Sequence, residues 1–323
     1  TISYRDWSSD VCSSDLKIVG TAFGFALTGL AAWVLYHEIR KYGLHEIVSG
    51  ISSIPAHRVA AAAFFAACCY TALTFYDLIA LRFLRNTLPY RKVALASFVG
   101  YAFAHNVGLS LVTAAPMKYR IYSAWGIGAL DVVKVVAFCG ATFWTGFAFL
   151  AGLAFLLEPA RIPEMISLHG VDARLAGIIL LGLVGAYLVL GLKGKDLRIG
   201  RFLLRIPSTK FGAAQIVAGS CEWIFASAVL YSLFTPELPI SYPAFLCIFL
   251  FAYVSGFASQ VPGGLGVFDT LILLSLKGVA SPPQIMAALL AYRAVYYIAP
   301  LILATMLLLF HEVTGRRPTG PRR

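Results

Sequence analysis

The chain has 323 residues, of which 59% are hydrophobic and only 13% are charged. Many of its windows reach the roughly 20 apolar residues needed to cross a hydrocarbon core of about 30 Å, which excludes an ordinary soluble domain. The net charge of +11 does not indicate nucleic-acid binding, because Lys and Arg lie mostly between the apolar spans, as positive-inside topology requires. We therefore expect an all-α polytopic membrane protein with no nucleic-acid partner.

Taken in chain order, the sequence begins with a segment that does not fit a membrane protein. Residues 1–16 are rich in Ser and Asp and lack the apolar core of a signal peptide. They resemble adapter-derived sequence, so we exclude them as a non-native leader. The expected transmembrane domain occupies residues 17–315, followed by a basic tail over residues 316–323. Its uninterrupted apolar spans are predicted at 17–37, 57–84, 126–157, 174–192, 211–234 and 281–310.

Two further apolar stretches are interrupted by residues that disfavour a continuous helix. We expect a structural break near Pro116 in the first stretch, residues 93–124. In the second stretch, residues 242–277, we expect a break at Pro262-Gly263-Gly264. Broken helices survive at membrane depth only inside protein or beside a wet cavity, since lipid cannot hydrogen-bond the freed backbone groups.

Loop charge predicts how these stretches are oriented. The loop at 193–210 carries six Lys and Arg residues and is placed in the cytoplasm, whereas residues 235–241 carry none and are placed outside. Each interrupted stretch must then begin and end on one side of the membrane, as a re-entrant hairpin or two short spans.

The order span, span, broken hairpin, span occurs twice, and the two copies have opposite orientation. The halves are about residues 17–158 and 174–310, and a shift of about 152 positions places Tyr101 on Tyr253. The predicted fold is therefore an inverted-topology repeat with two broken hairpins, an architecture in which transporters bind substrate at the repeat interface.

Ionisable side chains inside the apolar spans are the candidate site residues. Each costs roughly 2.5–3.5 kcal/mol at the centre of a membrane helix by insertion scales, so each should pair or face a cavity. We expect substrate binding by Asp77, Lys118, Arg120, Glu222, Asp269 and Arg293. No catalytic motif and no zinc-ligand spacing is present, so we expect no catalytic residue, metal or cofactor.

Structural explanations stay open for several of these side chains. Asp269 could cap the short helix after the Pro-Gly break, and Lys118 could extend to the cytoplasmic interface. Asp77 could pair with loop bases such as Arg82 or Arg85.

Other ionisable side chains within the spans have similar explanations. His105 could be an ordinary core histidine, and Asp131 and Lys134 are spaced to pair along one helix. Glu222 and Arg293 lie mid-span, where they are either functional or a buried pair.

Three segments resemble one known family. They are residues 260–269 (QVPGGLGVFD), residues 287–297 (AALLAYRAVYY) and residues 100–127, the last of which contains Arg120. These segments are similar to the membrane domain of the lysylphosphatidylglycerol synthase/flippase family, the multiple peptide resistance factor. The resemblance implies a lipid flippase whose charged residues fall on Asp77, Arg120, Glu222, Asp269 and Arg293.

The resemblance also sets the functional expectations. It implies transport of lysyl-phosphatidylglycerol from the inner to the outer leaflet of the bacterial cytoplasmic membrane, which gives resistance to cationic antimicrobial peptides. Full-length members carry a soluble aminoacyltransferase domain, which we expect to be absent from this chain. Two alternative functions stay open: a non-transporting anchor or regulator of such an enzyme, and a small-solute transporter. Assembly into a homo-oligomer also stays open.

Overall fold

The structure is a computed structural model that describes residues 52, 54–107, 110–157, 173–192, 197–199, 202–204, 207–234, 238–258 and 266–315. Four of the sequence predictions lie outside these residues: the leader, the first span at 17–37, the break at Pro262-Gly263-Gly264 and the basic tail.

Long helices form the body of the molecule. Five helices among the described residues are long and apolar enough to cross a membrane. They are α3 (Ala56–Phe83), α6 (Ala129–Leu157), α7 (Ala173–Leu192), α8 (Thr209–Ser232) and a continuous helix made of α11 (Pro282–Tyr292), the π-helical η4 (Arg293–Ile298) and α12 (Ala299–Gly315). Their bounds agree with the five predicted spans that fall on described residues, so the polytopic α-helical class is confirmed.

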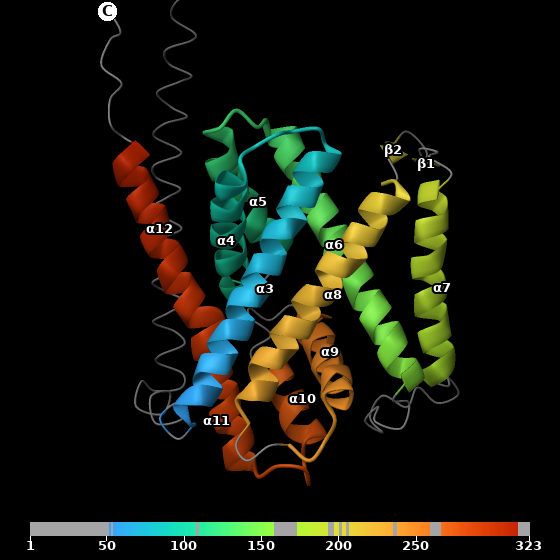
Figure 1. Ribbon diagram of the computed structural model, residues 1–323, viewed down its shortest axis with the longest axis vertical. Coiled ribbons are helices and arrows are strands. Elements are labelled where there is room, and N and C mark those ends of the chain that lie inside the picture. Colours follow the sequence, from blue (N-terminus) through green and yellow to red (C-terminus); the bar gives the residue numbers. More distant parts are fainter. Residues whose placement is uncertain are drawn as a thin grey trace, which may run out of the picture.

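Both interrupted stretches are helical hairpins. The first consists of α4 (Tyr90–Val107) and α5 (Ser110–Ser123), and the second of α9 (Tyr242–Ala258) and α10 (Val267–Ser275). The two hairpins lie at opposite ends of the molecule (Figure 1). One detail of the prediction is wrong: Pro116 lies inside α5, and the helix continues past it. Within a protein interior, neighbouring groups can accommodate the backbone bond that proline removes.

The connection between α7 and α8 carries the strands of the described chain. β1 (Leu197–Ile199) pairs antiparallel with β2 (Phe202–Leu204) in a short hairpin. This hairpin lies at the same end of the molecule as the α4–α5 hairpin (Figure 1). The α3–α4 connection and the helix ends beside it carry Arg82, Arg85, Arg91 and Lys92 at that end, which the positive-inside rule assigns to the cytoplasm.

The packing of the helices has the symmetry of an inverted repeat. The second spans of the two halves, α3 and α8, pack side by side at the centre of the molecule (Figure 1). Each first hairpin helix packs on the last span of the other half: α4 contacts η4 and α12, and α9 contacts α6. Where α3 packs on α8, the Cys69 thiol donates to the backbone carbonyl of Glu222 at 3.6 Å. The corresponding helices of the two halves therefore touch at the centre.

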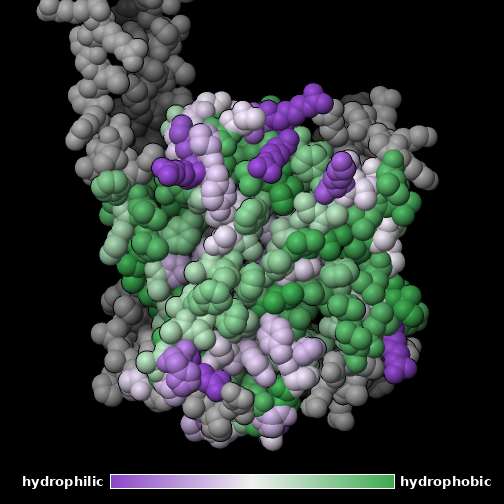
Figure 2. Space-filling model, viewed as in Figure 1, coloured by the Kyte–Doolittle hydropathy of each residue, from purple (hydrophilic) through white to green (hydrophobic). Residues whose placement is uncertain are grey.

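The surface is that of a membrane protein. Hydrophobic residues form a broad belt, and hydrophilic residues gather at the two ends (Figure 2). On α7, Ile178, Ile179 and Leu183 are each more than half exposed. Exposed apolar area on this scale is a liability in water and is expected where lipid tails cover it.

Close helix packing joins α6 to α8 inside this belt. A methyl group on Gly146 of α6 would overlap the backbone of Gly219 on α8, so only glycine permits this approach. Beside it, the Gln215 amide donates to the hydroxyl of Thr142 at 3.1 Å. Small residues that let membrane helices approach, with polar side chains hydrogen-bonded across them, are typical of such interfaces.

Candidate functional site

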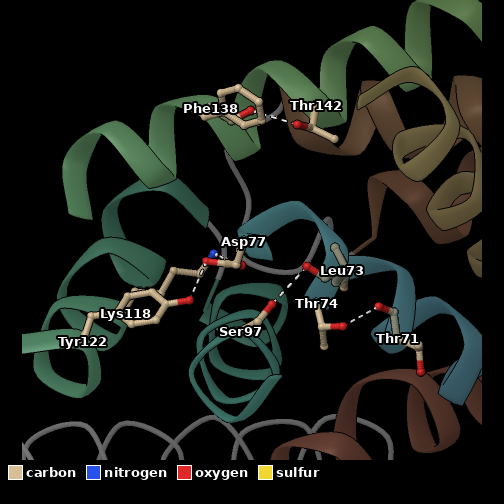
Figure 3. A network of polar contacts seen from close by, with 9 residues as sticks. All are labelled: Thr71, Leu73, Thr74, Asp77, Ser97, Lys118, Tyr122, Phe138 and Thr142. Carbon is tan, nitrogen blue, oxygen red and sulfur yellow. Dashed lines mark hydrogen bonds and ion pairs between the residues drawn. The ribbon is translucent and has the colours of Figure 1, made fainter. Parts of the chain in front are cut away.

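An ion pair ties the first hairpin to α3. Lys118 Nζ on α5 lies 2.8 Å from Asp77 Oδ2 on α3, and both side chains are at most 1% exposed. The Tyr122 hydroxyl, one helical turn beyond Lys118, donates to the other Asp77 oxygen at 3.1 Å. Figure 3 shows Lys118 and Tyr122 converging on Asp77. Lys118 Nζ also lies 3.9 Å from the ring centroid of Tyr101 on α4. The ammonium group therefore contacts both a carboxylate and an aromatic ring.

This geometry corrects two of the structural explanations. Lys118 does not extend to the cytoplasmic interface, because its ammonium is buried against Asp77. Asp77 does not pair with Arg82 or Arg85, because its partners come from the hairpin that packs on α3. Taking both charges out of water is repaid only when each is paired and hydrogen-bonded, as they are here.

A second ion pair ties the second hairpin to η4. Arg293 Nη2 lies 2.7 Å from Asp269 Oδ2, with side-chain exposures of 8% and 15%. The same oxygen accepts the backbone N–H of Gly266 at 3.2 Å, so Asp269 also caps the start of α10, as its position after the break predicted. Gly266 has a φ of +86°, a left-handed conformation that favours glycine.

Glu222 differs from the other buried acids. Its side chain is 2% exposed at mid-helix in α8, and the Tyr76 hydroxyl donates to Oε2 at 3.4 Å. Among the described residues, Arg293 pairs with Asp269 rather than with Glu222. The buried Glu222–Arg293 pair that the sequence left open therefore does not form in this structure.

Aromatic residues of η4 connect the hairpin tip to α3. The ring of His105, near the end of α4, stacks on Tyr296 with centroids 5.6 Å apart. Asn106 donates from Nδ2 to the Tyr297 carbonyl at 3.2 Å, and the Tyr296 hydroxyl lies 3.3 Å from Cys69 Sγ. Since π-helical segments inside α-helices occur frequently at functional sites, η4 is a candidate hinge of this site.

Arg120 and the Asp131–Lys134 pair lie apart from these contacts. Arg120 is half-buried on α5, two positions beyond Lys118, and residues at that spacing do not share a helix face. Asp131 and Lys134 form an exposed pair of 2.9 Å along α6, which confirms the structural explanation for both. The six predicted site residues are thus two separate ion pairs, the Glu222 carboxyl and the separate Arg120.

Comparison with known proteins identifies the family. No family model matches the chain. It is 34% identical over 304 residues to the uncharacterized protein slr0712 of Synechocystis sp., covering 93% of this chain and 94% of that protein. It is 32% identical over 246 residues to the inner membrane protein YbhN of Escherichia coli, covering 75% and 76% respectively. The chain belongs to the slr0712 and YbhN family of membrane proteins.

The chain also matches parts of larger proteins. The chain is 25% identical over 306 residues to the phosphatidylglycerol lysyltransferase of Staphylococcus haemolyticus, and 26% identical over 317 residues to that of Staphylococcus aureus. These matches cover 94% and 96% of the chain but only 35% and 36% of the two lysyltransferases. These matches confirm the resemblance to the membrane domain of that family.

The sequence of this slr0712 and YbhN family member predicts the ionisable residues of the site but not the side chains that contact them. Tyr101 and Tyr76, which contact Lys118 and Glu222, were not predicted. Each is a tyrosine inside an apolar helix, and no spacing signal links it to a charge on another helix.

Proposed function

We propose that this protein moves a phospholipid between the two leaflets of the membrane, with lysyl-phosphatidylglycerol as the substrate carried from the inner to the outer leaflet. The related phosphatidylglycerol lysyltransferases support this substrate, because the activity of those proteins attaches a lysyl group to phosphatidylglycerol. A positively charged lipid in the outer leaflet would lower the attraction of the surface for cationic antimicrobial peptides.

One observation carries the proposal: each of the two opposed hairpins is held by a buried ion pair. Asp77–Lys118 fixes one hairpin and Asp269–Arg293 fixes the other. Packing alone would not require charges at this depth, since well-packed apolar residues serve as well or better. Paired broken helices entering from opposite sides are typical of transporters that rock around a central site.

The charges also suit the proposed headgroup. Arginine binds phosphate through two parallel hydrogen bonds, so Arg120 and Arg293 are the proposed phosphate ligands. Carboxylates bind ammonium groups, so Asp77, Asp269 and Glu222 are the proposed partners of the lysyl amines, with Lys118 as a further phosphate ligand. For the headgroup to enter, the two ion pairs must open and exchange their partners for the lipid.

A test in cells separates transport from regulation. The chain is expressed beside a separate enzyme that makes lysyl-phosphatidylglycerol, and an impermeant amine reagent measures the lipid exposed outside, while extraction measures the total. Transport predicts a larger exposed fraction at constant total. An anchor or regulator of the enzyme instead predicts a changed total at a constant exposed fraction.

The test variant changes a buried ion pair, and its control changes an exposed ion pair. Asp269→Asn is expected to reduce the exposed fraction, and Asp131→Asn, in the exposed pair on α6, is expected to leave it unchanged. An exposed fraction that does not respond to the wild-type chain contradicts the proposal.

A further inference from the structure

The Glu222 carboxyl is buried without a compensating cation. Asp77 and Asp269 are each held by a base, Lys118 and Arg293 respectively. Among the described residues, the side chain of Glu222 has one hydrogen-bond partner, the Tyr76 hydroxyl at 3.4 Å, and no lysine or arginine within ion-pair distance.

The side chains that interact with the Glu222 carboxyl are neutral. They are Cys69 and Tyr76 from α3, Tyr253 from α9 and Tyr296 from η4. Cys139 on α6, Tyr187 on α7 and Tyr292 on α11 are further thiols and phenols, which are uncharged near pH 7. Among the charged groups on these neighbouring helices, Asp77 is held in an ion pair with Lys118, Asp131 with Lys134 and Arg293 with Asp269. His105 is separated from Cys69 by the ring of Tyr296, on which it stacks.

An isolated buried carboxylate is so costly that such a group takes up a proton instead. We propose that Glu222 is the proton-binding residue of the transport cycle, carrying a proton in this conformation and releasing it when a cationic lipid headgroup takes its place. This inference rests on the proposed lipid transport and names the ion that drives it.

The position of Glu222 is suited to such an exchange. It lies where α3 packs on α8, and its backbone carbonyl accepts a hydrogen bond from the thiol of Cys69 in the other half. Any rotation of one half against the other therefore changes its surroundings. When the rotation opens the site to the cytoplasm, Glu222 loses its proton to water on that side and the resulting carboxylate pairs with a lysyl ammonium. When the rotation opens the site to the outside, the lipid leaves to the outer leaflet and a proton from that side replaces it.

This exchange conserves charge. Lysyl-phosphatidylglycerol carries one phosphate and two amines, a single net positive charge, and one proton returns for each lipid that leaves. A pH gradient should therefore drive transport, whereas an electrical potential alone should not. At one-to-one exchange the lipid ratio between leaflets follows the proton ratio, so one pH unit of acidity outside should enrich the outer leaflet up to about tenfold.

The experiment uses the full chain in vesicles containing labelled lysyl-phosphatidylglycerol, with an imposed pH gradient, an imposed potassium potential, or neither. We expect enrichment toward the acidic side for the wild type, no response to the potential, and loss of the gradient response in Glu222→Gln. Asp131→Asn, in the exposed pair on α6, is the matched control and should keep the response.

A second measurement does not depend on transport. Infrared spectroscopy of the purified chain at neutral pH should show a carbonyl band of a protonated acid that Glu222→Gln removes and Asp131→Asn retains. Absence of that band overturns the proposal, as does a gradient response that persists in Glu222→Gln. Lipid exchange that ignores the gradient overturns proton coupling alone, whereas no exchange under any condition overturns the proposed function and the coupling with it.

Discussion

Tyr101 and Tyr253, 152 positions apart, make the same kind of aromatic contact in the two halves of the protein. Tyr101 on α4 lies edge-on to Tyr76 of α3, with ring planes at 84°, and Tyr253 on α9 lies edge-on to Trp223 of α8, with planes at 85°. Each hairpin thus packs an aromatic ring edge-on against the second span of its own half, α3 or α8. Edge-to-face pairs of this kind contribute about 0.5–1.5 kcal/mol beyond the area they bury, so they help to fix both hairpins.

The inverted arrangement predicts opposite accessibility for two exposed serines. Ser208 precedes α8 at the cytoplasmic end, and Ser241 precedes α9 at the other end. Single cysteines at these positions should react with an impermeant thiol reagent from opposite sides of the membrane. Reaction of both from the same side would contradict the topology. The native Cys69, Cys139 and Cys247 are buried, whereas Cys68 and Cys221 are only partly buried, so the native cysteines, Cys12 included, are replaced by serine or alanine beforehand.

The Asp77–Lys118 pair should behave as a coupled unit in stability measurements. Removing one partner from a buried pair typically costs about 3–5 kcal/mol, because the other charge is left uncompensated. Asp77→Asn and Lys118→Met should each lower the unfolding midpoint in detergent, and the double variant should lose less than the sum of the two. Additive losses would show that the two side chains do not stabilise each other.

Arg293 is expected to need its guanidinium group and not merely its charge. Lysine keeps the charge but loses the planar donor geometry that reaches Asp269 and a lipid phosphate. Since hydrogen bonds to charged groups are worth about 1.5–3 kcal/mol, Arg293→Lys should slow leaflet exchange about tenfold or more. The conservative Lys134→Arg change in the exposed pair serves as the control. Exchange at the wild-type rate in Arg293→Lys would remove Arg293 from the site.

Gly146 is expected to tolerate no side chain. Its Cβ would meet the backbone of Gly219, so Gly146→Ala must push α6 and α8 apart. Overpacking typically costs about 1–3 kcal/mol, and a lower unfolding midpoint should result. Gly140, two turns earlier on the same helix, has open space where a Cβ would lie. Gly140→Ala should therefore be neutral or slightly stabilising, and equal effects of the two changes would contradict the packing.

Much of this fold could be predicted because lipid restricts what the backbone can do. Span length, loop charge and the count of crossings were enough to require that residues 93–124 and 242–277 turn back, and the structure has helical hairpins in both places. Pro116 was misread because proline disfavours a helix interior in general, whereas α5 continues through it.

The partners within the candidate site could not be predicted in the same way. Lys118 and Asp77 are 41 positions apart on different helices, and only the packing of α5 on α3 brings them together. Likewise, no spacing in the sequence indicates that Arg293, the first residue of η4, pairs with Asp269 rather than with Glu222.

Leaflet exchange by the purified chain tests the proposed function most directly. Vesicles that contain lysyl-phosphatidylglycerol or an uncharged lipid are prepared with wild-type protein, with Glu222→Gln, or without protein. We expect wild-type protein to raise the rate at which the lysyl amine becomes accessible to an impermeant reagent. Glu222→Gln should slow the lysyl lipid more than the uncharged one. A wild-type rate equal to that of protein-free vesicles would contradict lipid transport by this protein.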